Sequence, residues 1–323
     1  MPIPMLFLPP QNDNTRKWAK AVADACPELE VIIPETREGA EQAIALAEGA
    51  FGTIPAALLP RAGHLRWLQA PQAAPPAGYY YPELIAHPVQ ITNFREIYND
   101  HIAAHIMAFV LAFARGLQVY FPQQLRREWK PAPREDDTIV HLPEATALIV
   151  GVGGIGAEAA RLAAAFGITV IGIDERRPDK PEGVVEMHRA AALDQLLPRA
   201  EFVILTVPHT PETEGFFNRA RFQRMKRSAF FINIGRGMTT KLDDLVAALD
   251  AKEIAGAALD VYEIEPLPAS HPLWTMANVL LTPHTAGHGP YLDDRRLEVL
   301  IDNAKRFAAG APLRNLVDKV RWF

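Results

Sequence analysis

Arg236, Glu265 and His284 are the side chains of this sequence best suited to chemistry on a small polar molecule. Each lies in a short segment that follows an apolar stretch, respectively INIGRG (232–237), VYEIEPLP (261–268) and LTPHTAG (281–287). Arginine offers a planar fork that matches a carboxylate bidentately, which lysine cannot imitate. Imidazole donates a proton near neutral pH, and a glutamate beside it favours the charged form that holds this proton. Singly, each would be an ordinary loop charge, so the prediction depends on their joint position after strands.

A glycine-rich turn further upstream predicts a dinucleotide site. The segment LIVGVGGIG (148–156) has the composition of a strand, a turn and the start of a helix, with Gly151, Gly153 and Gly156 spaced as G-x-G-x-x-G. In this spacing the first glycine makes the turn, the second lets backbone approach a pyrophosphate, and the third allows the helix to pack closely on the strand. The helix N-terminus adds free N–H groups and partial positive charge. Alone, the motif also fits a purely structural turn.

Asp174 supports the dinucleotide prediction and indicates which dinucleotide binds. It ends the next predicted strand, 174 − 151 = 23 residues after the first glycine, near the ~20-residue offset of an acid that binds a ribose 2′-hydroxyl. Its carboxylate and that of Glu175 repel a 2′-phosphate, which favours NAD. Arg176 and Arg177 follow directly, so NADP is the alternative cofactor. Combined with the Arg/Glu/His set, this turn predicts hydride transfer to a small 2-keto acid.

Composition argues against several classes of protein. The chain has 323 residues, 49% apolar and 22% charged, with a net charge of −5. This length favours two domains, and the lack of a polybasic run argues against a nucleic-acid binder. Apolar runs stop well short of the ~20 residues that a membrane span needs. We therefore expect no nucleic-acid or membrane partner.

Cysteine, histidine and the N-terminal segment bear on metal binding and compartment. Cys26 is the only cysteine, and the ten histidines are dispersed without metal-ligand spacing. The first residues, MPIPMLFLPP, have no basic region and are typical of a buried strand rather than a signal peptide. We therefore expect no metal and a reducing, cytoplasmic setting.

Short apolar runs alternate with amphipathic stretches throughout, which is the pattern of parallel α/β architecture. The first half of the chain predicts strands at 4–8, 29–34, 65–70 and 89–94, and helices at 15–25 and 39–50. The second half predicts strands at 147–151, 169–174, 202–208, 230–235, 255–261 and 278–284. Between the halves we expect one helix from 99 to about 118 and an irregular connection over 121–145, and a closing helix covers 291–310. The second series is the more uniformly apolar, as in a sheet covered on both faces.

In this order, the segments resemble the D-isomer-specific 2-hydroxyacid dehydrogenases. The resemblance covers nearly the whole chain and rests on GVGGIG, VPHTPETEGFF (207–217), FINIGRG, LTPHTAG and above all AGAALDVYEIEPLPASHPLW (255–274). It implies an NAD(P)-dependent 2-hydroxyacid oxidoreductase built from two doubly wound parallel-sheet domains, Rossmann-like or flavodoxin-like. The nucleotide domain would comprise residues 99–287 and the substrate domain residues 1–98 with 288–323. An active site in the cleft between the domains is implied.

The resemblance also assigns roles to individual residues. It makes His284 the acid/base, Glu265 its partner, and Arg236 the residue that binds and polarises the substrate. The expected cofactor contacts are Gly151, Gly153, Gly154, Ile155, Gly156, Asp174, Arg176, Val207, Pro208, Thr213, Ile234, Asp260 and Gly287. Among these, Asp260 would contact the nicotinamide carboxamide.

The substrate loop departs from the family pattern. Where the family often has a Ser-x-Gly loop for the substrate, this chain has Gln72, Ala73 and Ala74 among prolines, which lack N–H donors. Ala104 stands where the family usually has an acid. The three tyrosines at 79–81 either line a pocket or pack, and we expect packing for at least two.

The same resemblance suggests substrates and partners. Glyoxylate or hydroxypyruvate is the expected substrate, because short-chain reductases of the family accept both, and phosphoglycerate is an alternative. Formate is disfavoured, because the formate branch replaces the residue at the position of Glu265. The alternative from another class is an NAD(H)-sensing binding protein, similar to corepressors with this fold. Homodimers are usual in the family, with residues 99–145 at the interface.

Overall fold

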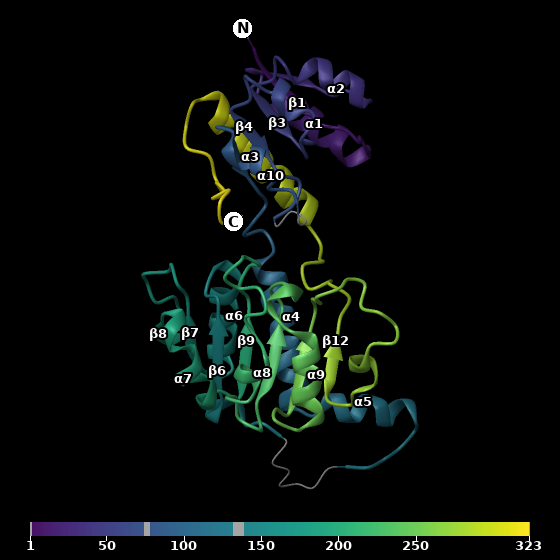
Figure 1. Cartoon of the computed structure of the whole chain (residues 1–323), viewed down its shortest axis with the longest axis vertical. Helices are drawn as coiled ribbons and strands as arrows, with labels where there is room; N and C mark the ends of the chain where they lie inside the picture. Colours follow the sequence, from purple (N-terminus) through teal and green to yellow (C-terminus); the bar gives the residue numbers. More distant parts are fainter. Residues whose placement is uncertain (1, 74–77, 132–138, 323) are drawn as a thin grey trace. The chain divides into compact units, whose positions relative to one another are not determined.

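The computed structural model describes residues 2–73, 78–131 and 139–322. It divides into two compact units, the first made of Met1–Ile97 with Pro290–Phe323 and the second of Tyr98–Gly289. Each unit has its own sheet, shown in Figure 1. Their assignment to substrate and cofactor remains a prediction.

The second unit is built on seven parallel strands in the order β12-β11-β10-β9-β6-β7-β8. The strands are β6 (Thr146–Val150), β7 (Thr169–Ile173), β8 (Val184–His188), β9 (Phe202–Leu205), β10 (Phe230–Asn233), β11 (Gly256–Leu259) and β12 (Val279–Leu281). This is the Rossmann strand order with one strand added beyond β11. The chain order reverses between β6 and β9, and open α/β folds bind ligands at such a switch point.

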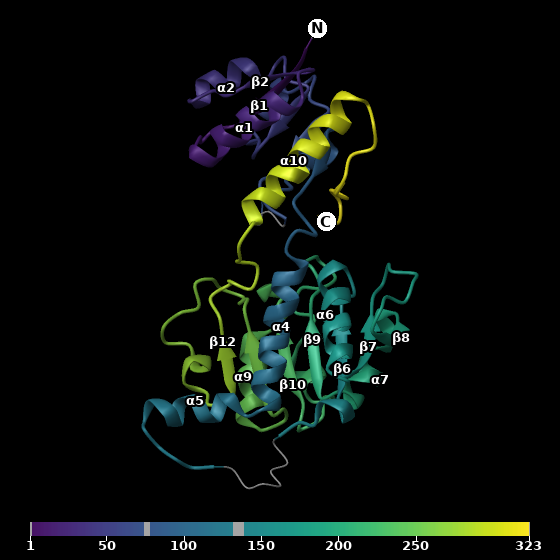
Figure 2. The same cartoon turned by 180° about the vertical axis from the view of Figure 1, so that it is seen from behind.

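Helices cover both faces of this sheet. On one face lie α4 (Asn99–Ala114) and α6 (Gly154–Ala165), and on the other α7 (Leu193–Leu196), α8 (Arg219–Phe222) and α9 (Leu242–Asp250), as Figures 1 and 2 show from opposite sides. A separate apolar core fills each side. Every residue of β9, β10 and β11 is buried, which confirms the prediction of a sheet covered on both faces.

The first unit is a smaller doubly wound sheet of five parallel strands in the order β2-β1-β3-β4-β5. The strands are β1 (Ile3–Phe7), β2 (Leu29–Ile32), β3 (Gly49–Phe51), β4 (Trp67–Gln69) and β5 (Gln90–Thr92), and its helices are α1 (Asp13–Ala25), α2 (Arg37–Ala43), α3 (Pro82–Ala86) and α10 (Leu292–Ala308). This strand order is that of flavodoxin. The closing helix α10 belongs to this unit, where Phe307 packs on Trp67 with ring centroids 5.3 Å apart. The predicted fold class is confirmed for both sheets.

The helix predicted over 99–118 is wrong in its extent. The helix α4 ends at Ala114, and Gly116 adopts a left-handed conformation with φ of 67°. A second helix, α5 (Leu117–Leu125), then enters the stretch that the sequence predicts to be irregular. Glycine takes positive φ without steric cost and commonly ends helices in this way.

Two strands escape the sequence patterns. The helix predicted over 39–50 ends at Ala43, and its last residues form β3, which pairs between β1 and β4. Three small or apolar residues carry no alternation, so long-range pairing rather than local pattern decides this strand. The edge strand β8 was also missed, because its sequence VVEMH mixes polar and apolar residues.

The described residues contain neither a long apolar helix nor a cluster of metal ligands. No single helix among them has the length and hydropathy of a membrane span, although α4 and α5 together reach that length and hydropathy as a pair bent by 78°. No group of three His, Cys, Asp or Glu side chains among them lies close enough to hold a metal ion.

Candidate active site

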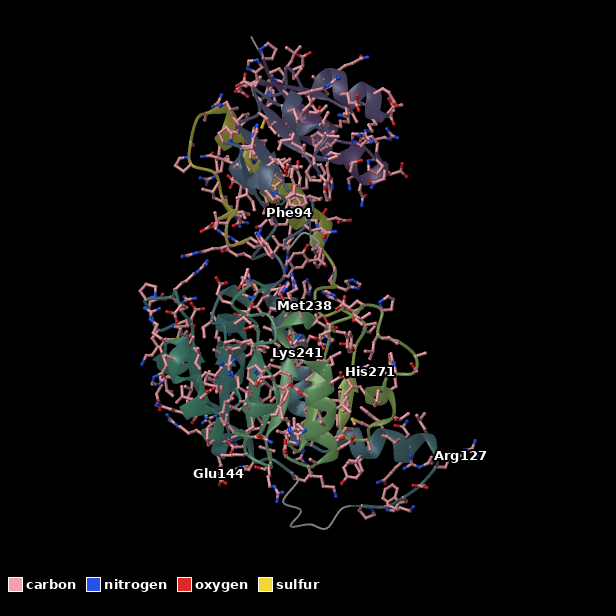
Figure 3. The ribbon with its side chains drawn as sticks, viewed as in Figure 1. Phe94, Arg127, Glu144, Met238, Lys241 and His271 are labelled. Atoms are coloured by element: carbon pink, nitrogen blue, oxygen red, sulfur yellow. The ribbon has the colours of Figure 1, made fainter. Side chains whose placement is uncertain are left out.

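Arg236, Glu265 and His284 follow three neighbouring strands of the second unit. They come after β10, β11 and β12, which are adjacent and parallel. Because parallel strands end at the same edge of a sheet, their loops gather there. Figure 3 shows Met238, in the loop of Arg236, at this edge. The topology therefore brings together the three residues that the sequence singled out.

His284 and Glu265 form a direct pair. The His284 Nδ1 atom lies 2.7 Å from Glu265 Oε2, and the second carboxylate oxygen accepts the backbone N–H of Tyr262 at 3.0 Å. A carboxylate only accepts, so Nδ1 carries a proton and Nε2 is the nitrogen left to exchange one. The side chains of His284 and Glu265 are 48% and 36% exposed, which leaves the pair accessible to a ligand.

Arg236 lies close to this pair and is partly buried. Burial lowers the pKa of its guanidinium, and the negative charge of Glu265 opposes that shift. Its Nη1 atom donates to the carbonyl of Gly235 at 2.6 Å. Within the part of the chain that the structure describes, Arg236 forms no ion pair. The rest of its fork is therefore available to an anionic ligand.

Buried polar contacts fix the backbone of Arg236. Asn233, at the end of β10, donates from Nδ2 to the Arg236 carbonyl at 3.2 Å, and Thr239 Oγ1 donates to the same oxygen at 2.5 Å. A Cβ atom at Gly237 would overlap the backbone of Tyr262. Glycine therefore allows the loop of Arg236 to approach the loop of Glu265. Asn233 and Thr239 were not predicted from the sequence. The signal at Asn233 is a polar residue that ends an otherwise apolar strand, whereas Thr239 lies in the loop after it.

The glycine turn has the geometry of a phosphate site. Gly151 has φ of 98°, and a Cβ atom at Gly156 would overlap the Gly151 carbonyl, so both positions need glycine. Gly153 instead faces open space, with nothing within 4 Å of a Cβ atom placed there. The helix α6 begins at Gly154 without a side-chain cap. Its first N–H groups are thus available to a pyrophosphate.

Asp174 directly follows β7 and organises the turn there. Its Oδ1 atom accepts the N–H groups of Arg176 at 2.8 Å and Arg177 at 2.9 Å. Arg189 donates from Nη1 to the carbonyls of Asp174 and Glu175, at 3.2 and 2.6 Å. The Oδ2 atom makes none of these contacts and can accept a ribose hydroxyl.

The other expected cofactor residues lie on or near the same edge. Val207 packs against Gly151, and Ile234 is buried at the end of β10. Thr213 donates from Oγ1 to the Pro208 carbonyl at 2.7 Å, so it closes the turn after β9. Ile155 lies in the first turn of α6, and Gly287 lies beside Tyr98.

Asp260 is hydrogen-bonded to the loop that carries His284. It is 1% exposed, and its carboxylate accepts the Thr282 hydroxyl at 2.6 Å and the N–H groups of Thr285 and Ala286 at 2.8 and 3.0 Å. His284 itself has φ of 53°, which costs a residue other than glycine roughly 1–2 kcal/mol. These bonds therefore stabilise a strained turn. The expected contact of Asp260 with the nicotinamide carboxamide stays a prediction.

The expected substrate loop is only partly described. Gln72 is exposed, and the Ala73 carbonyl accepts Asn93 Nδ2 at 2.8 Å. Ala74 lies outside the described residues. Tyr79 and Tyr81 donate their hydroxyls to the carbonyls of residues 52 and 54, at 3.1 and 3.0 Å. These two tyrosines thus have structural contacts in the first unit.

Comparison with known proteins assigns the chain to a family. Residues 107–286 match the family model described as "D-isomer specific 2-hydroxyacid dehydrogenase, NAD binding domain". The chain belongs to the D-isomer specific 2-hydroxyacid dehydrogenase family. As a member, it is an NAD(P)-dependent oxidoreductase that acts on 2-hydroxy or 2-keto acids.

Individual members of the D-isomer specific 2-hydroxyacid dehydrogenase family are similar over most of the chain. Glyoxylate/hydroxypyruvate reductase B of Citrobacter koseri is 36% identical over 260 residues, which cover 78% of each protein. A family member from Xanthobacter autotrophicus Py2, solved with NADPH and MES, superposes with a TM-score of 0.86 at 30% identity over the full length of both chains. The NADPH-dependent glyoxylate/hydroxypyruvate reductase of Sinorhizobium meliloti, solved with NADP and sulfate, gives 0.81 at 29% identity, over 99% of this chain and 100% of that one.

Proposed function

We propose that this protein reduces glyoxylate or hydroxypyruvate with a reduced nicotinamide dinucleotide, and that His284 is its acid/base. The pairing of His284 Nδ1 with Glu265 Oε2 at 2.7 Å, beside Arg236, is the observation that carries the proposal. The similar reductases from Citrobacter koseri and Sinorhizobium meliloti act on the same two acids by name, which supports the choice of substrate.

In the proposed mechanism, Arg236 binds the carboxylate of the substrate and polarises the carbonyl group at C2. When bound, the reduced dinucleotide supplies the hydride that adds to the carbonyl carbon. His284 gives the proton on Nε2 to the carbonyl oxygen, and its Nδ1 proton stays on the bond to Glu265. Glu265 stabilises the imidazolium before the transfer. In the reverse direction, neutral His284 accepts the hydroxyl proton at Nε2.

A panel of keto acids tests the substrate assignment. The consumption of NADH and NADPH is followed by absorbance with glyoxylate, hydroxypyruvate, pyruvate and phosphohydroxypyruvate. We expect the highest kcat/KM with glyoxylate or hydroxypyruvate. Preference for phosphohydroxypyruvate would instead support the phosphoglycerate alternative. Stabilisation of the protein by dinucleotide, without turnover of any acid, would favour the sensor.

We propose NADH as the preferred reductant, because Asp174 repels a 2′-phosphate. Asp174→Asn tests this, since the amide oxygen can still accept the N–H groups of Arg176 and Arg177 while the charge is lost. Removing a unit charge near a phosphate is worth on the order of 1 kcal/mol in a solvated site. We expect the ratio of kcat/KM for NADPH to that for NADH to rise about fivefold. A wild-type protein that prefers NADPH would contradict the proposal.

We also propose that the chain forms a homodimer through α5 and the described residues that follow it. Four large apolar side chains are exposed there, namely Val119, Phe121, Leu125 and Trp129, the last two at 86% and 94%. Clusters of this kind mark interaction sites. Light scattering should give twice the chain mass of 35.7 kDa, and Leu125→Glu combined with Trp129→Glu should reduce it to one chain. A monomeric wild type would contradict this.

The proposed setting is the reducing cytoplasm. The single cysteine supports this, since Cys26 is buried and free, and burial raises the pKa of its thiol. Fractionation of the native host would test the location.

A further inference from the structure

A chain of side-chain hydrogen bonds runs from α4 to the loop of His284. His105 Nε2 lies 3.0 Å from Thr282 Oγ1, and Thr282 Oγ1 lies 2.6 Å from Asp260 Oδ1. Asp260 then accepts the N–H groups of Thr285 and Ala286. The bonds of Asp260 therefore fall on both sides of His284, one before it and two after it.

The chemistry of the three groups fixes the direction of this chain. Asp260 can only accept, so the Thr282 hydroxyl gives its single proton to the carboxylate. The hydroxyl oxygen then has only lone pairs to offer, and His105 must donate from Nε2. Burial lowers the pKa of His105, while the charge of Asp260 opposes that shift. A neutral His105 therefore carries its proton on Nε2, and its ring is held edge-on to Phe109 at 4.7 Å.

The turn that these bonds hold is tight and specific. The His284 N–H donates to the Thr282 carbonyl at 3.0 Å, across Pro283, and Tyr262 donates its hydroxyl to the same carbonyl at 2.9 Å. The Tyr262 N–H also binds Glu265. Both partners of the His284–Glu265 pair are thus anchored on the same few residues. Any loosening of Thr282 changes where the imidazole lies relative to the carboxylate.

We propose that Thr282 and His105 are positioning residues, which hold the strained turn so that His284 meets Glu265 in the geometry for proton transfer. This inference rests on the proposed role of His284 as the acid/base. Neither residue needs to touch substrate or cofactor. Thr282 acts through Asp260 and the turn, and His105 acts through the Thr282 hydroxyl.

Thr282→Val tests the proposal, because valine keeps the shape and removes the hydroxyl. Loss of a hydrogen bond to a charged group typically corresponds to a tenfold change or more. We therefore expect kcat to fall about tenfold or more, with the KM for keto acid and the calorimetric Kd for NADH each within about threefold of wild type. Thr282→Ser restores the hydroxyl and should restore kcat to within about threefold.

A double-mutant cycle with Glu265→Gln separates positioning from general damage. If Thr282 acts through the His284–Glu265 pair, Thr282→Val should lower kcat by less than about threefold once Glu265 is already replaced. The same loss in both backgrounds would overturn the proposal, as would unchanged kcat in Thr282→Val. His105→Phe, which keeps an aromatic ring against Phe109, provides a second variant in case Thr282→Val does not fold. It should reduce kcat about threefold in wild type and leave it unchanged in Glu265→Gln.

These outcomes are distinct from failure of the proposed function. If the wild type reduces no keto acid, or if His284→Asn retains full activity, the acid/base role itself fails and this inference falls with it. If the wild type is active and His284 is essential, but Thr282 and Glu265 act independently, only the positioning role is overturned.

Discussion

Replacing His284 with alanine is expected to lower kcat for keto-acid reduction by about 10²–10⁴-fold, the usual contribution of a general acid. The Kd for NADH should stay within about threefold of wild type, because the glycine turn and Asp174 lie after β6 and β7 rather than in the loop of His284. Steady-state kinetics and calorimetry measure the two quantities separately.

His284 has a left-handed backbone conformation, so a second variant that tolerates this conformation is needed beside His284→Ala. Its φ of 53° is strained for alanine, whereas asparagine adopts this region more readily and has no titrating proton to give. His284→Asn should therefore lose the same activity with less loss of stability. His141→Ala is the control, since His141 is exposed and pairs with Glu144 before β6. Activity near the wild-type level in His284→Asn would show that another group donates the proton.

Replacing Arg236 with lysine is expected to raise the KM for keto acid at least about tenfold. Lysine presents a point charge and cannot bind a carboxylate with two parallel hydrogen bonds. A lost hydrogen bond to a charged group is worth about 1.5–3 kcal/mol, and 1.4 kcal/mol is tenfold in affinity. Initial rates over a range of glyoxylate and hydroxypyruvate concentrations measure the effect.

Arg224 offers a control for the same type of change. It is a surface residue after α8, and its Nε atom lies 3.9 Å from Asp194. Arg224→Lys should leave both KM and kcat within about twofold. If Arg236→Lys also behaves like wild type, the guanidinium fork does not bind the substrate carboxylate.

Much of the second unit is predictable because its strands are almost entirely apolar. Runs such as FVIL and FFIN, each buried throughout, have no other stable place than a covered parallel sheet. Their carboxyl ends then align the loops of Arg236, Glu265 and His284 without further information. The edge strand β8 and the short strand β3 lack this signal, because pairing partners far along the chain determine them.

The residues that hold the loop of His284 in place could not be predicted in the same way. His105 lies in a helix more than a hundred residues before Thr282, and no spacing rule joins two such positions. The family resemblance predicts that Asp260 contacts the cofactor, yet its carboxylate accepts three hydrogen bonds from the loop of His284. Such contacts depend on how α4 packs against the sheet and on the direction of each hydrogen bond. Sequence type alone does not carry that information.

Transfer of a labelled hydride tests the central claim most directly. Hydroxypyruvate is reduced with NADH that carries deuterium at C4, in separate reactions for each of the two positions, and the product is analysed for configuration and label. We expect D-glycerate with deuterium at C2 from one of the two labelled forms, and formation of this product at least about 10²-fold more slowly by His284→Asn. Formation of L-glycerate, or D-glycerate formed by the His284 variant at the wild-type rate, would contradict it.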